Sequence, residues 1–500
     1  MKYVLAIDEG TTGVTCLMIG QDGVVAGRGY CEIPQHFPKP GWVEHDALEI
    51  LECALSSARA AIAEAGAMPA AIGITNQRET IVVWERATGR PVHNAIVWQD
   101  RRTTQRCAEL ALRAGWIAER TGLLPDPYFS ATKLEWLLHH ERLLERYRAS
   151  ELAAGTIDSW LVWHLTRGAV HATDPTNASR TMLFDINRKE WSEELCDLFG
   201  VPISMLPKVR PSSGDFGMAS AELFGAEIPI RGIAGDQQAA LFGQGCWTRG
   251  SGKNTYGTGA FFLLNTGAER PAAGWDAGGL LTTIACNAEG GPVYALEGAI
   301  FIAGAAVQWL RDGLGIITSA GEAEGLARSI GSTDGVYFVP ALTGLGAPAW
   351  EPRARGTIVG LTRGTGRAHL VRAALEAMAY ATNDVLGVMR DATRSTDMRF
   401  ERLRVDGGAT NNDWLMQFQA DVLGVPVERP DMVDTTALGA AGLAGLAVGV
   451  WGSAEDFLST RRFTTFAPQM DRESTAKAIR GWRRAVRAAV SWARDEEGRA

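Results

Sequence analysis

The chain has 500 residues, of which 46% are hydrophobic and 21% charged, and it carries a formal net charge of −8 at pH 7. Because single hydrophobic cores stop growing at roughly 250–300 residues, this composition predicts a globular protein with two large domains. The acidic balance argues against a nucleic-acid-binding protein, and it supplies no basic patch for an anionic membrane.

Predicted strands and helices occur throughout the chain, which indicates the α/β class. Short apolar runs predict strands at 3–7, 14–19, 24–27, 71–75, 81–84 and 402–405. Helical periodicity predicts helices at 46–65, 102–114, 131–149, 192–199 and 414–423. Asp46 is the expected N-cap of the first of these helices.

A polar turn of the form Asp-x-Gly-x-Thr follows a predicted strand near both ends of the chain, starting at Asp8 and at Asp406. This short repeated motif is expected in a sequence whose two halves have similar folds and face each other. The glycine-rich stretch 243–252 is the expected boundary, and it divides the chain into domains 1–247 and 248–500.

The cysteines and the weakly polar segments bear on the protein's environment. The seven cysteines, at 16, 31, 53, 107, 196, 246 and 286, form no Cys-x-x-Cys pair. We therefore expect neither a disulfide framework nor a zinc site, and a reduced cytoplasmic chain fits best.

Asp8 and Glu9 interrupt the first apolar run too early for a signal peptide. The Ala- and Gly-rich stretch 437–451 is shorter than the ~20 apolar residues of a membrane span, so it predicts a buried helix.

Three glycine-containing turns have the composition of phosphate-binding loops: Gly10-Thr11-Thr12, Gly257-Thr258-Gly259 and Asp406-Gly407-Gly408. Glycine allows close approach of the backbone to an oxyanion, and Thr adds a hydroxyl donor. The chain has no Gly-x-x-x-x-Gly-Lys-Ser/Thr motif, which excludes a Walker-type site. A single Gly-Thr turn is most often structural, but three of them favour a cleft built from two halves.

Several other side chains are candidates for a site. Asp236 follows a predicted strand and precedes a predicted helix, so local sequence favours a helix N-cap, although a base at the mouth of a cleft is compatible with the same position. The adjacent Arg78 and Glu79 pair a donor with an acceptor for hydroxyl groups, or form a surface ion pair. Trp98, Tyr128 and Phe261 suit either ordinary core packing or the carbon face of a small polyol.

Nine motifs in order along nearly the whole chain resemble glycerol kinases of the FGGY carbohydrate kinase family. They are GITNQRET (73–80), NAIVWQDRRT (94–103), DPYFSATK (126–133), TNASRTMLF (176–184), GIAGDQQAALFGQ (232–244), KNTYGTGAF (253–261), LLTTIAC (280–286), GLGAPAWEPRARG (344–356) and LRVDGGATNNDWLMQFQADVLG (403–424). ITNQRET and GDQQAALFGQ, from the first and fifth motifs, point to the glycerol branch. The resemblance implies an actin-like ATPase fold, in which two ribonuclease-H-like domains surround a central cleft.

The resemblance also implies an activity, the ATP-dependent phosphorylation of glycerol with Mg²⁺, and a set of residues for it. The implied polyol site comprises Arg78, Glu79, Trp98, Tyr128, Asp236, Gln237 and Phe261, with Asp236 as the catalytic base. The implied nucleotide site comprises Thr11, Thr12, Thr258, Gly304, Gln308, Gly408 and Asn412. Asp8 matches the family's residue near the phosphates and the magnesium ion. Homodimers or homotetramers are implied as well, and neither nucleic acid nor a membrane is an expected partner.

The sequence departs from the family pattern at the first phosphate loop. Glu9 stands where the family has Gln, and Thr15 replaces the arginine expected to meet the γ-phosphate, so we expect weaker ATP binding or slower transfer unless another cation compensates. Ala131 replaces a usual glycine, a change of little expected effect. The loop FGAEIPIRG (224–232) has neither an arginine in the expected place nor any histidine, so neither control by a sugar bisphosphate nor control by histidine phosphorylation is expected.

Two other functions remain as alternatives. The first is another sugar kinase of the family, acting on a pentulose or an aldonate, which would need different residues at the positions of Arg78, Glu79 and Trp98. The second is an actin-fold ATPase that uses the nucleotide as a switch, which would hydrolyse ATP slowly without an acceptor. The complete set of polyol residues argues against this second alternative.

Overall fold

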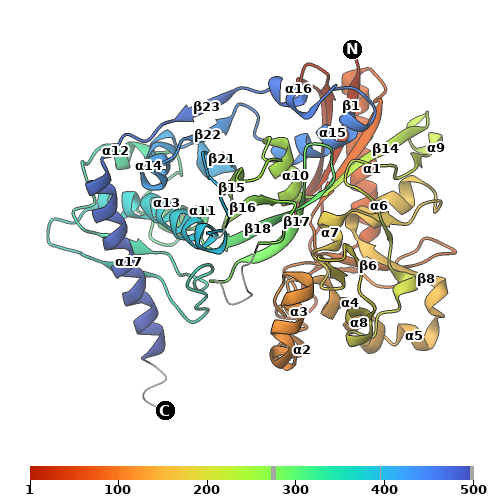
Figure 1. The fold of residues 1–500 in the computed structure, drawn as a ribbon, viewed down its shortest axis with the longest axis horizontal. Coiled ribbons are helices and arrows are strands. Elements are labelled where there is room, and N and C mark those ends of the chain that lie inside the picture. The colour runs from red at the N-terminus through yellow and green to blue at the C-terminus, as the bar shows by residue number, and fades with distance from the viewer. Residues whose placement is uncertain (272–277, 395, 496–500) are drawn as a thin grey trace.

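The computed structural model describes residues 1–271, 278–394 and 396–495. Two large β-sheets with helices on their faces lie in successive halves of the chain, and the N-terminal sheet occupies the right of Figure 1. The two-domain α/β organisation predicted from the sequence is therefore present. Among the described residues no helix is both long and apolar enough to cross a membrane.

The first sheet has six strands in the order β13-β14-β5-β1-β2-β3. Leu5 and Ile7 pack in a core cluster with α1, whereas Val4 and Ala6 pack in another with α15, because successive side chains of a strand point to opposite faces. The two covering helices are α1 (Ala47–Ala65) and α15 (Thr435–Ala447). The strands are β1 (Tyr3–Glu9), β2 (Gly13–Gly20), β3 (Val25–Glu32), β5 (Ala71–Asn76), β13 (Met218–Ala219) and β14 (Ile228–Gly235).

Helix α15 comes from the C-terminal part of the chain but packs on the N-terminal sheet, and Figure 1 shows it in blue beside the red β1. Its small residues allow this close approach. A Cβ added at Gly439 would come within 1.8 Å of the Ala239 carbonyl oxygen of α10 (Asp236–Gly243). This is the buried small-residue helix that the sequence predicts within 437–451, and it joins the two halves.

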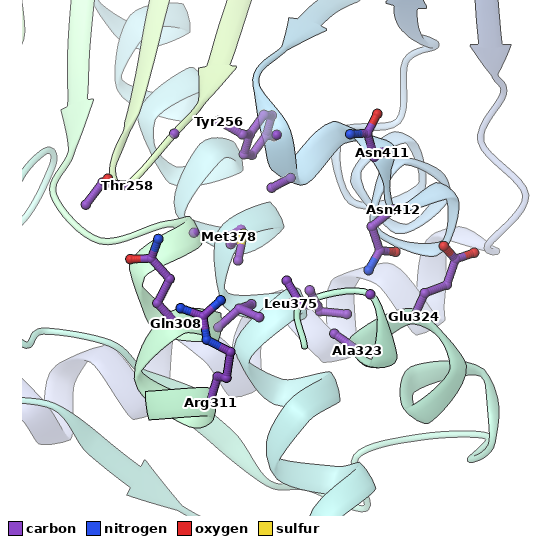
Figure 2. A pocket seen from close by; sticks show the side chains of 17 residues that line it. Tyr256, Thr258, Gln308, Arg311, Ala323, Glu324, Leu375, Met378, Asn411 and Asn412 are labelled. Atoms are coloured by element: carbon purple, nitrogen blue, oxygen red, sulfur yellow. The ribbon is translucent and has the colours of Figure 1, made fainter. Parts of the chain in front are cut away.

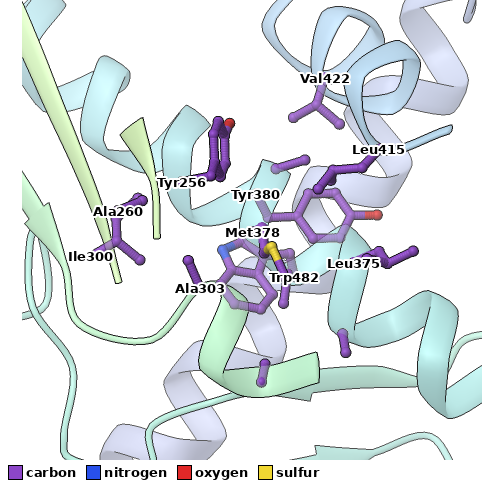
Figure 3. Close-up of a cluster of buried hydrophobic side chains, with 14 of the residues drawn as sticks. Tyr256, Ala260, Ile300, Ala303, Leu375, Met378, Tyr380, Leu415, Val422 and Trp482 are labelled. Carbon is purple, nitrogen blue, oxygen red and sulfur yellow. The ribbon is translucent and has the colours of Figure 1, made fainter. Parts of the chain in front are cut away.

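The second sheet has seven strands in the order β17-β18-β16-β15-β21-β22-β23. Its core contains Tyr256 of β15, Tyr380 of α13 and Trp482 of α17, which converge in Figure 3. The strands are β15 (Gly252–Tyr256), β16 (Ala260–Gly267), β17 (Leu281–Cys286), β18 (Pro292–Ile300), β21 (Leu403–Asp406), β22 (Val427–Pro430) and β23 (Phe463–Phe466). The helices of this half are α11 (Gly304–Asp312), α12 (Glu322–Arg328), α13 (Arg367–Ala392), α14 (Asp413–Leu423), α16 (Ala454–Ser459) and α17 (Arg472–Arg494).

Smaller sheets complete the fold. A four-stranded sheet has the order β4-β7-β6-β8, and three two-stranded sheets pair β10 with β11, β12 with β9 and β19 with β20. These strands are β4 (Glu44–His45), β6 (Ile81–Glu85), β7 (Ala95–Ile96), β8 (Leu152–Thr156), β9 (Ala172–Thr173), β10 (Phe184–Asp185), β11 (Glu190–Trp191), β12 (Lys208–Val209), β19 (Tyr337–Val339) and β20 (Thr357–Val359). The remaining helices are α2 (Thr104–Glu109), α3 (Ala114–Thr121), α4 (Ser130–His140), α5 (Leu143–Arg146), α6 (Ile157–Leu165), α7 (Pro175–Ala178), α8 (Glu193–Leu198) and α9 (Ala221–Phe224).

Two predicted helices are interrupted in the structure. The helix predicted at 102–114 ends at Glu109, and a 3₁₀ turn (Ala111–Arg113) separates α2 from α3. The helix predicted at 131–149 divides into α4 and α5, because Arg142 adopts a left-handed φ of 51°. Leu110 and Leu143, next to the two breaks, are both buried in the same core cluster, and such tertiary packing overrides local helix propensity.

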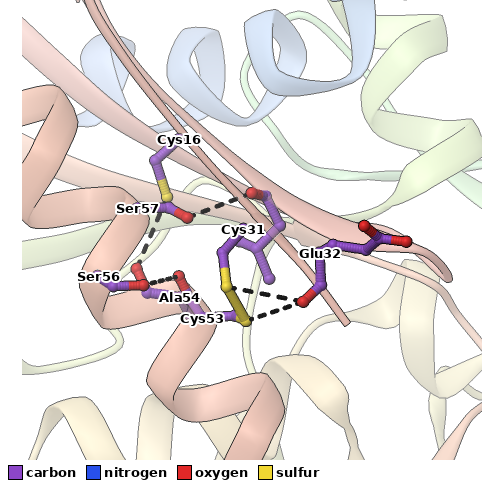
Figure 4. The surroundings of a disulfide bond; sticks show 8 residues. Cys16, Cys31, Glu32, Cys53, Ala54, Ser56 and Ser57 are labelled. Atoms are coloured by element: carbon purple, nitrogen blue, oxygen red, sulfur yellow. Dashed lines mark hydrogen bonds between the residues drawn. A yellow bond between two sulfur atoms is a disulfide. The ribbon is translucent and has the colours of Figure 1, made fainter. Parts of the chain in front are cut away.

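The cysteines differ from the sequence-based expectation. Cys31 of β3 and Cys53 of α1 form a disulfide bond (Figure 4), whereas Cys16, Cys107, Cys196, Cys246 and Cys286 are free and buried. The expectation that no disulfide forms was wrong here, because strand β3 and helix α1 pack face to face and place the two Cα atoms 5.2 Å apart. The two cysteines are 22 positions apart in sequence, and no spacing motif marks them.

Candidate active site

The turn between β5 and β6 places Arg78 and Glu79 inside the protein rather than on its surface. Both side chains are 2% exposed. The Arg78 Nη1 atom donates to Glu297 Oε2 at 2.6 Å, its Nη2 donates to the Tyr128 hydroxyl at 3.1 Å, and its Nε lies 3.2 Å from Asp236 Oδ1. The alternative of a surface ion pair is therefore wrong, because both residues belong to a buried network.

Two members of this network, Arg180 and Glu297, were missed by the sequence analysis. Arg180 Nε donates to Glu79 Oε1 at 2.7 Å, and Arg180 Nη2 donates to Glu297 Oε1 at 2.9 Å. The two arginines and the two glutamates thus alternate, with Asp236 beside Arg78. We call Arg78, Glu79, Arg180, Asp236 and Glu297 the charge network.

Glu297 links the charge network to the second sheet. It lies on β18, whereas Arg78, Glu79 and Arg180 belong to the N-terminal half. It is also the one charged residue in the strand PVYALEGAI, and this isolated charge in an apolar run is the signal that could have identified it. Burial opposes its ionisation, but Arg180 and Arg78 lower the pKa of Glu297 to about 2, so it stays ionised at neutral pH.

Asp236 is the first residue of α10, not its N-cap as local sequence favoured. Gly235 occupies the N-cap position, and no side chain caps the helix there. The Asp236 Oδ1 atom accepts from the adjacent Gln237 amide at 2.6 Å, and its side chain remains 35% exposed. Burial raises the pKa of Asp236 and Arg78 opposes that rise. The carboxylate is thus held beside a cation and is still accessible, as a general base requires.

Gln237 is held by a buried lysine that the sequence analysis also missed. Lys253 Nζ donates to Gln237 Oε1 at 2.5 Å and to Thr255 Oγ1 at 2.6 Å. Burial lowers the pKa of Lys253, while Asp406 and Asp236 oppose that shift. The amide nitrogen of Gln237 is left as the free donor of this side chain, since its oxygen is occupied.

The three aromatic candidates are distributed around the charge network. The Trp98 and Tyr128 rings meet edge to face with centroids 5.5 Å apart, and Trp98 Nε1 donates to Thr11 Oγ1 at 2.9 Å. Phe261 lies on β16, two residues before Leu263, which pairs with Glu297. All three rings are half-buried, so each keeps a face accessible to a small molecule.

The other predicted residues gather around a cavity of about 610 Å³ in the second half. Thr258, Gly304, Gln308, Gly408 and Asn412 all line it, and Figure 2 shows Gln308 and Arg311 opposite Asn411 and Asn412. Tyr256, Leu375 and Met378 supply apolar lining. Its volume is that of a pocket for a drug-sized ligand, so this cavity is large enough for a nucleotide.

Close backbone contacts explain two glycines at this cavity. Gly407 has a φ of 90°, and a Cβ there would lie 2.3 Å from the Tyr256 carbonyl oxygen. A Cβ at Gly304 would lie 2.6 Å from the Gly257 carbonyl oxygen. The turns that the sequence marked as phosphate loops therefore pack directly on each other, and their exposed edge lines the cavity.

The first phosphate loop joins β1 to β2 and lies outside that cavity. Gly10 donates its amide to the Gly13 carbonyl at 3.0 Å, Thr11 is half-buried and Thr12 is exposed. Asp8 ends up beside Thr15, its register partner on β2. Burial, together with Asp236 and Asp434, raises the pKa of Asp8 to about 7, which shows that three carboxylates share this region.

The next question is whether these carboxylates can bind the expected magnesium ion. Among the described residues, no group of three or more His, Cys, Asp or Glu side chains is arranged to hold a metal. Carboxylate oxygens are nevertheless the ligands that Mg²⁺ prefers, usually one or two of them together with water and substrate phosphates. Burial raises the pKa of Asp8 first, and repulsion from Asp236 and Asp434 adds to that rise; a divalent cation would oppose both effects, so Asp8 fits this role.

Comparisons with known proteins show what the chain is similar to. Two family models match the chain, the N-terminal domain of the FGGY family of carbohydrate kinases at residues 3–243 and its C-terminal domain at residues 252–448. The chain is 52% identical over 499 residues to a glycerol kinase of Thermotoga maritima, covering 98% of this chain and 99% of that protein.

Two solved structures have the same fold. The first is the crystal structure of Plasmodium falciparum glycerol kinase with ADP, with a TM-score of 0.92, 36% identity and 98% of each chain covered. The second is that of a gluconate kinase from Lactobacillus acidophilus, with a TM-score of 0.87, 20% identity and 98% of each chain covered. At that lower identity the likeness shows the fold alone.

Proposed function

The chain belongs to the FGGY family of carbohydrate kinases, and on that premise we propose that it transfers the γ-phosphoryl group of ATP to glycerol, giving sn-glycerol 3-phosphate. The observation that carries the proposal is the accessible Asp236 carboxylate, 3.2 Å from a buried Arg78 that also belongs to an ion-pair network with Glu79. Glycerol offers three hydroxyls and little apolar surface, and these groups supply both donors and acceptors for it.

The residues have separate roles in the reaction. Arg78, Glu79 and the free amide of Gln237 bind hydroxyls of glycerol, while the rings of Trp98, Tyr128 and Phe261 cover its carbon side. Asp236 accepts the proton of the attacking primary hydroxyl. The hydroxyl oxygen then bonds to the γ-phosphorus of ATP, the bond from that phosphorus to the bridging oxygen breaks, and ADP leaves.

The nucleotide fits the 610 Å³ cavity, with Thr258, Gly304, Gln308, Gly408 and Asn412 around it. Thr11 and Thr12 extend from the first half toward the phosphates. Asp8 would hold Mg²⁺, which when bound neutralises charge on the phosphate oxygens. Most of the protein's contribution is positioning, because phosphoryl transfer passes through a loose transition state.

The charge network gives selectivity as well as binding. A site whose buried polar groups pair with each hydroxyl rejects analogues that lack one, because those groups are then left unpaired. The short triol fits between the network and the aromatic rings. This favours glycerol over the pentuloses and aldonates of other family members, whose longer chains need additional room.

Further properties complete the proposal. We place the domain division at 1–247 and 248–500, and we propose that the protein acts in the cytoplasm as a homodimer or homotetramer. Neither nucleic acid nor a membrane is needed as a partner. The first phosphate loop is the basis for expecting weakened ATP use unless another cation compensates. The loop 224–232 is the basis for expecting that neither a sugar bisphosphate nor histidine phosphorylation acts through that loop.

A substrate panel tests the proposal. With ATP and Mg²⁺, a coupled assay of ADP release is expected to show turnover with glycerol and little without an acceptor. Faster turnover with xylulose or gluconate would favour the alternative of another sugar kinase. Slow ADP release that no acceptor accelerates would favour an ATPase switch, and either result would overturn the assignment.

A further inference from the structure

A second cavity, of about 430 Å³, lies where the chain passes between the two halves. It is lined by residues of the linker 244–251, which connects α10 to β15, and by residues 397–404, which lead into β21. We call it the linker cavity. It is concave and of a size for a small molecule.

The linker cavity and the nucleotide cavity lie at opposite ends of the same two strands. β15 and β21 pair in parallel, with Gly252 opposite Leu403 and Thr255 opposite Asp406. Ser251 and Arg402 line the linker cavity just before these strands, and the turns at Gly257 and Gly408 line the nucleotide cavity just after them. A ligand in the linker cavity therefore contacts Arg404 of β21, the strand that leads to the Gly408 turn.

Four arginines line the linker cavity: Arg249, Arg399, Arg402 and Arg404. Arg402 and Arg404 both pair with Glu428, at 3.3 and 3.0 Å. Within 1–271, 278–394 and 396–495, Arg249 and Arg399 make neither a side-chain hydrogen bond nor an ion pair. Both side chains are exposed at the cavity. The chain has 57 acidic residues against 49 basic ones, so two arginines of one cavity without a carboxylate partner are available to bind an external anion.

The backbone of the linker is shaped to lie against these arginines. Gly250 has a φ of 85°, and a Cβ there would come 2.3 Å from the Arg399 carbonyl oxygen. Gly245 has a φ of 71°, and a Cβ there would come 2.6 Å from Arg404 Nη1. A side chain at position 250 would push the linker away from the backbone of 397–404, and one at position 245 would be strained by its positive φ, so Gly250 keeps the cavity walls together.

The remaining polar lining suggests the chemistry of the ligand. Thr248 and Ser251 supply hydroxyls, and the exposed carboxylates of Asp397 and Glu401 stand at the same cavity. Arginines recognise phosphate through two parallel N–H donors. Carboxylates accept hydrogen bonds from hydroxyl groups, and they repel an anion that carries no hydroxyl group. This combination favours a molecule that carries both a phosphate group and hydroxyls over a bare anion.

We propose that the linker cavity binds a small phosphorylated polyhydroxy compound, with its phosphate against Arg249 and Arg399. If the protein is the kinase proposed above, this ligand also affects catalysis, because the linker begins at the end of α10, whose first residue is Asp236. Occupation of the cavity fixes the linker and hence the position of one half of the site relative to the other.

Direct binding tests the cavity without relying on activity. The protein is saturated with ADP and glycerol so that the proposed active site is filled, and glycerol 2-phosphate is titrated by isothermal calorimetry, with inorganic phosphate in parallel. We expect one site of roughly millimolar affinity for the ester and weaker binding of inorganic phosphate. In the Arg249→Ala/Arg399→Ala variant the affinity should fall by at least about tenfold, as loss of a charge-assisted contact predicts.

The matched control is Arg484→Ala/Arg487→Ala, which removes the same charge from two exposed arginines of α17. Its affinity for the ester should equal that of the unmodified protein. Equal weakening in both double variants would assign the effect to net charge, and no weakening in the first, or no binding to the unmodified protein, would also overturn the proposal. Single Arg249→Gln and Arg399→Gln variants, each checked by thermal unfolding, separate a binding loss from a folding defect. An ester that binds normally to a protein without glycerol kinase activity would leave this site intact and refute only the function.

Discussion

The polyol side and the nucleotide side of the proposed active site are built in different ways. The polyol side is a network of charged side chains, with Arg78, Glu79, Arg180 and Glu297 at most 2% exposed. The nucleotide side is a cavity formed largely by the turns at Gly257 and Gly408 and by the start of α11. The first depends on pairing charges removed from water, whereas the second depends on backbone shape.

This difference predicts unequal sensitivity to substitution. Removing one partner from a buried ion pair leaves the other charge uncompensated and costs about 3–5 kcal/mol. Removing one side chain that hydrogen bonds at the edge of an open cavity costs about 0.5–1.5 kcal/mol. Substitutions on the polyol side should therefore affect both folding and turnover, and those on the nucleotide side should affect mainly the KM for ATP.

The largest effect is expected for Asp236→Asn. Loss of the base should lower kcat by roughly 10²–10⁴-fold, while the affinity for ADP, measured by calorimetry, stays near that of the unmodified protein. A variant that keeps kcat within a few-fold of the original would show that Asp236 is not the base.

The pH profile of the unmodified enzyme sharpens this assignment. Burial raises the pKa of Asp236 above its ordinary value, and the base must be ionised to accept a proton. The kcat/KM for glycerol should thus rise with pH through that elevated pKa and fall toward acid. A profile that stays flat down to the ordinary carboxyl range would contradict the assignment.

Glu297→Gln should have the next largest effect. It leaves Arg78 and Arg180 without their shared carboxylate, so we expect a loss of about 3–5 kcal/mol in the free energy of unfolding and a KM for glycerol raised at least tenfold. Chemical denaturation and steady-state kinetics measure the two quantities.

Glu376→Gln is the matched control for Glu297→Gln. Glu376 is also buried and pairs with Arg372 at 2.9 Å, but it lies on α13, away from the charge network. This variant should lose stability without changing the KM for glycerol. Equal changes in KM for both variants would mean that Glu297 acts only through general stability.

Gln308→Ala tests the nucleotide side. Gln308 lines the cavity and its side chain is exposed, so its loss should raise the KM for ATP about threefold to tenfold. Neither kcat nor the KM for glycerol should change appreciably. A large loss of stability here would contradict the contrast between the two sides.

The smallest effect is expected for Thr15→Arg. Thr15 is the register partner of Asp8, so an arginine there would offset the negative charge of Asp8, Asp236 and Asp434 and add a cation near the phosphates. We expect kcat/KM for ATP to increase a few-fold. A tenfold increase would correspond to a decrease of about 1.4 kcal/mol in the activation free energy. Thr15→Gln serves as the uncharged control, and the absence of any gain with Thr15→Arg would refute the expectation that the lost arginine weakens ATP use.

The sequence predicts the nucleotide side of this site better than the polyol side. The turns at Gly257 and Gly408 were predicted because Gly and Thr at close spacing encode a backbone shape, and both turns do line one cavity. Arg180 and Glu297 were missed because their role depends on the ion pair between them, and the two residues are 117 positions apart in sequence. The local pattern also misjudged Asp236 as a helix cap, since nothing nearby in sequence reveals Arg78.

The α/β class, the strands β1, β2, β3, β5, β6 and β21 and the glycine turns follow from the sequence alone, because hydrophobic periodicity and the backbone freedom of glycine act over a few residues. Only the tertiary structure decided that Cys31 meets Cys53, that α15 packs on the N-terminal sheet, and that Glu297 joins two arginines of the other half. Burial makes such distant charges attract strongly and makes their isolation costly, and burial is a property of the folded chain.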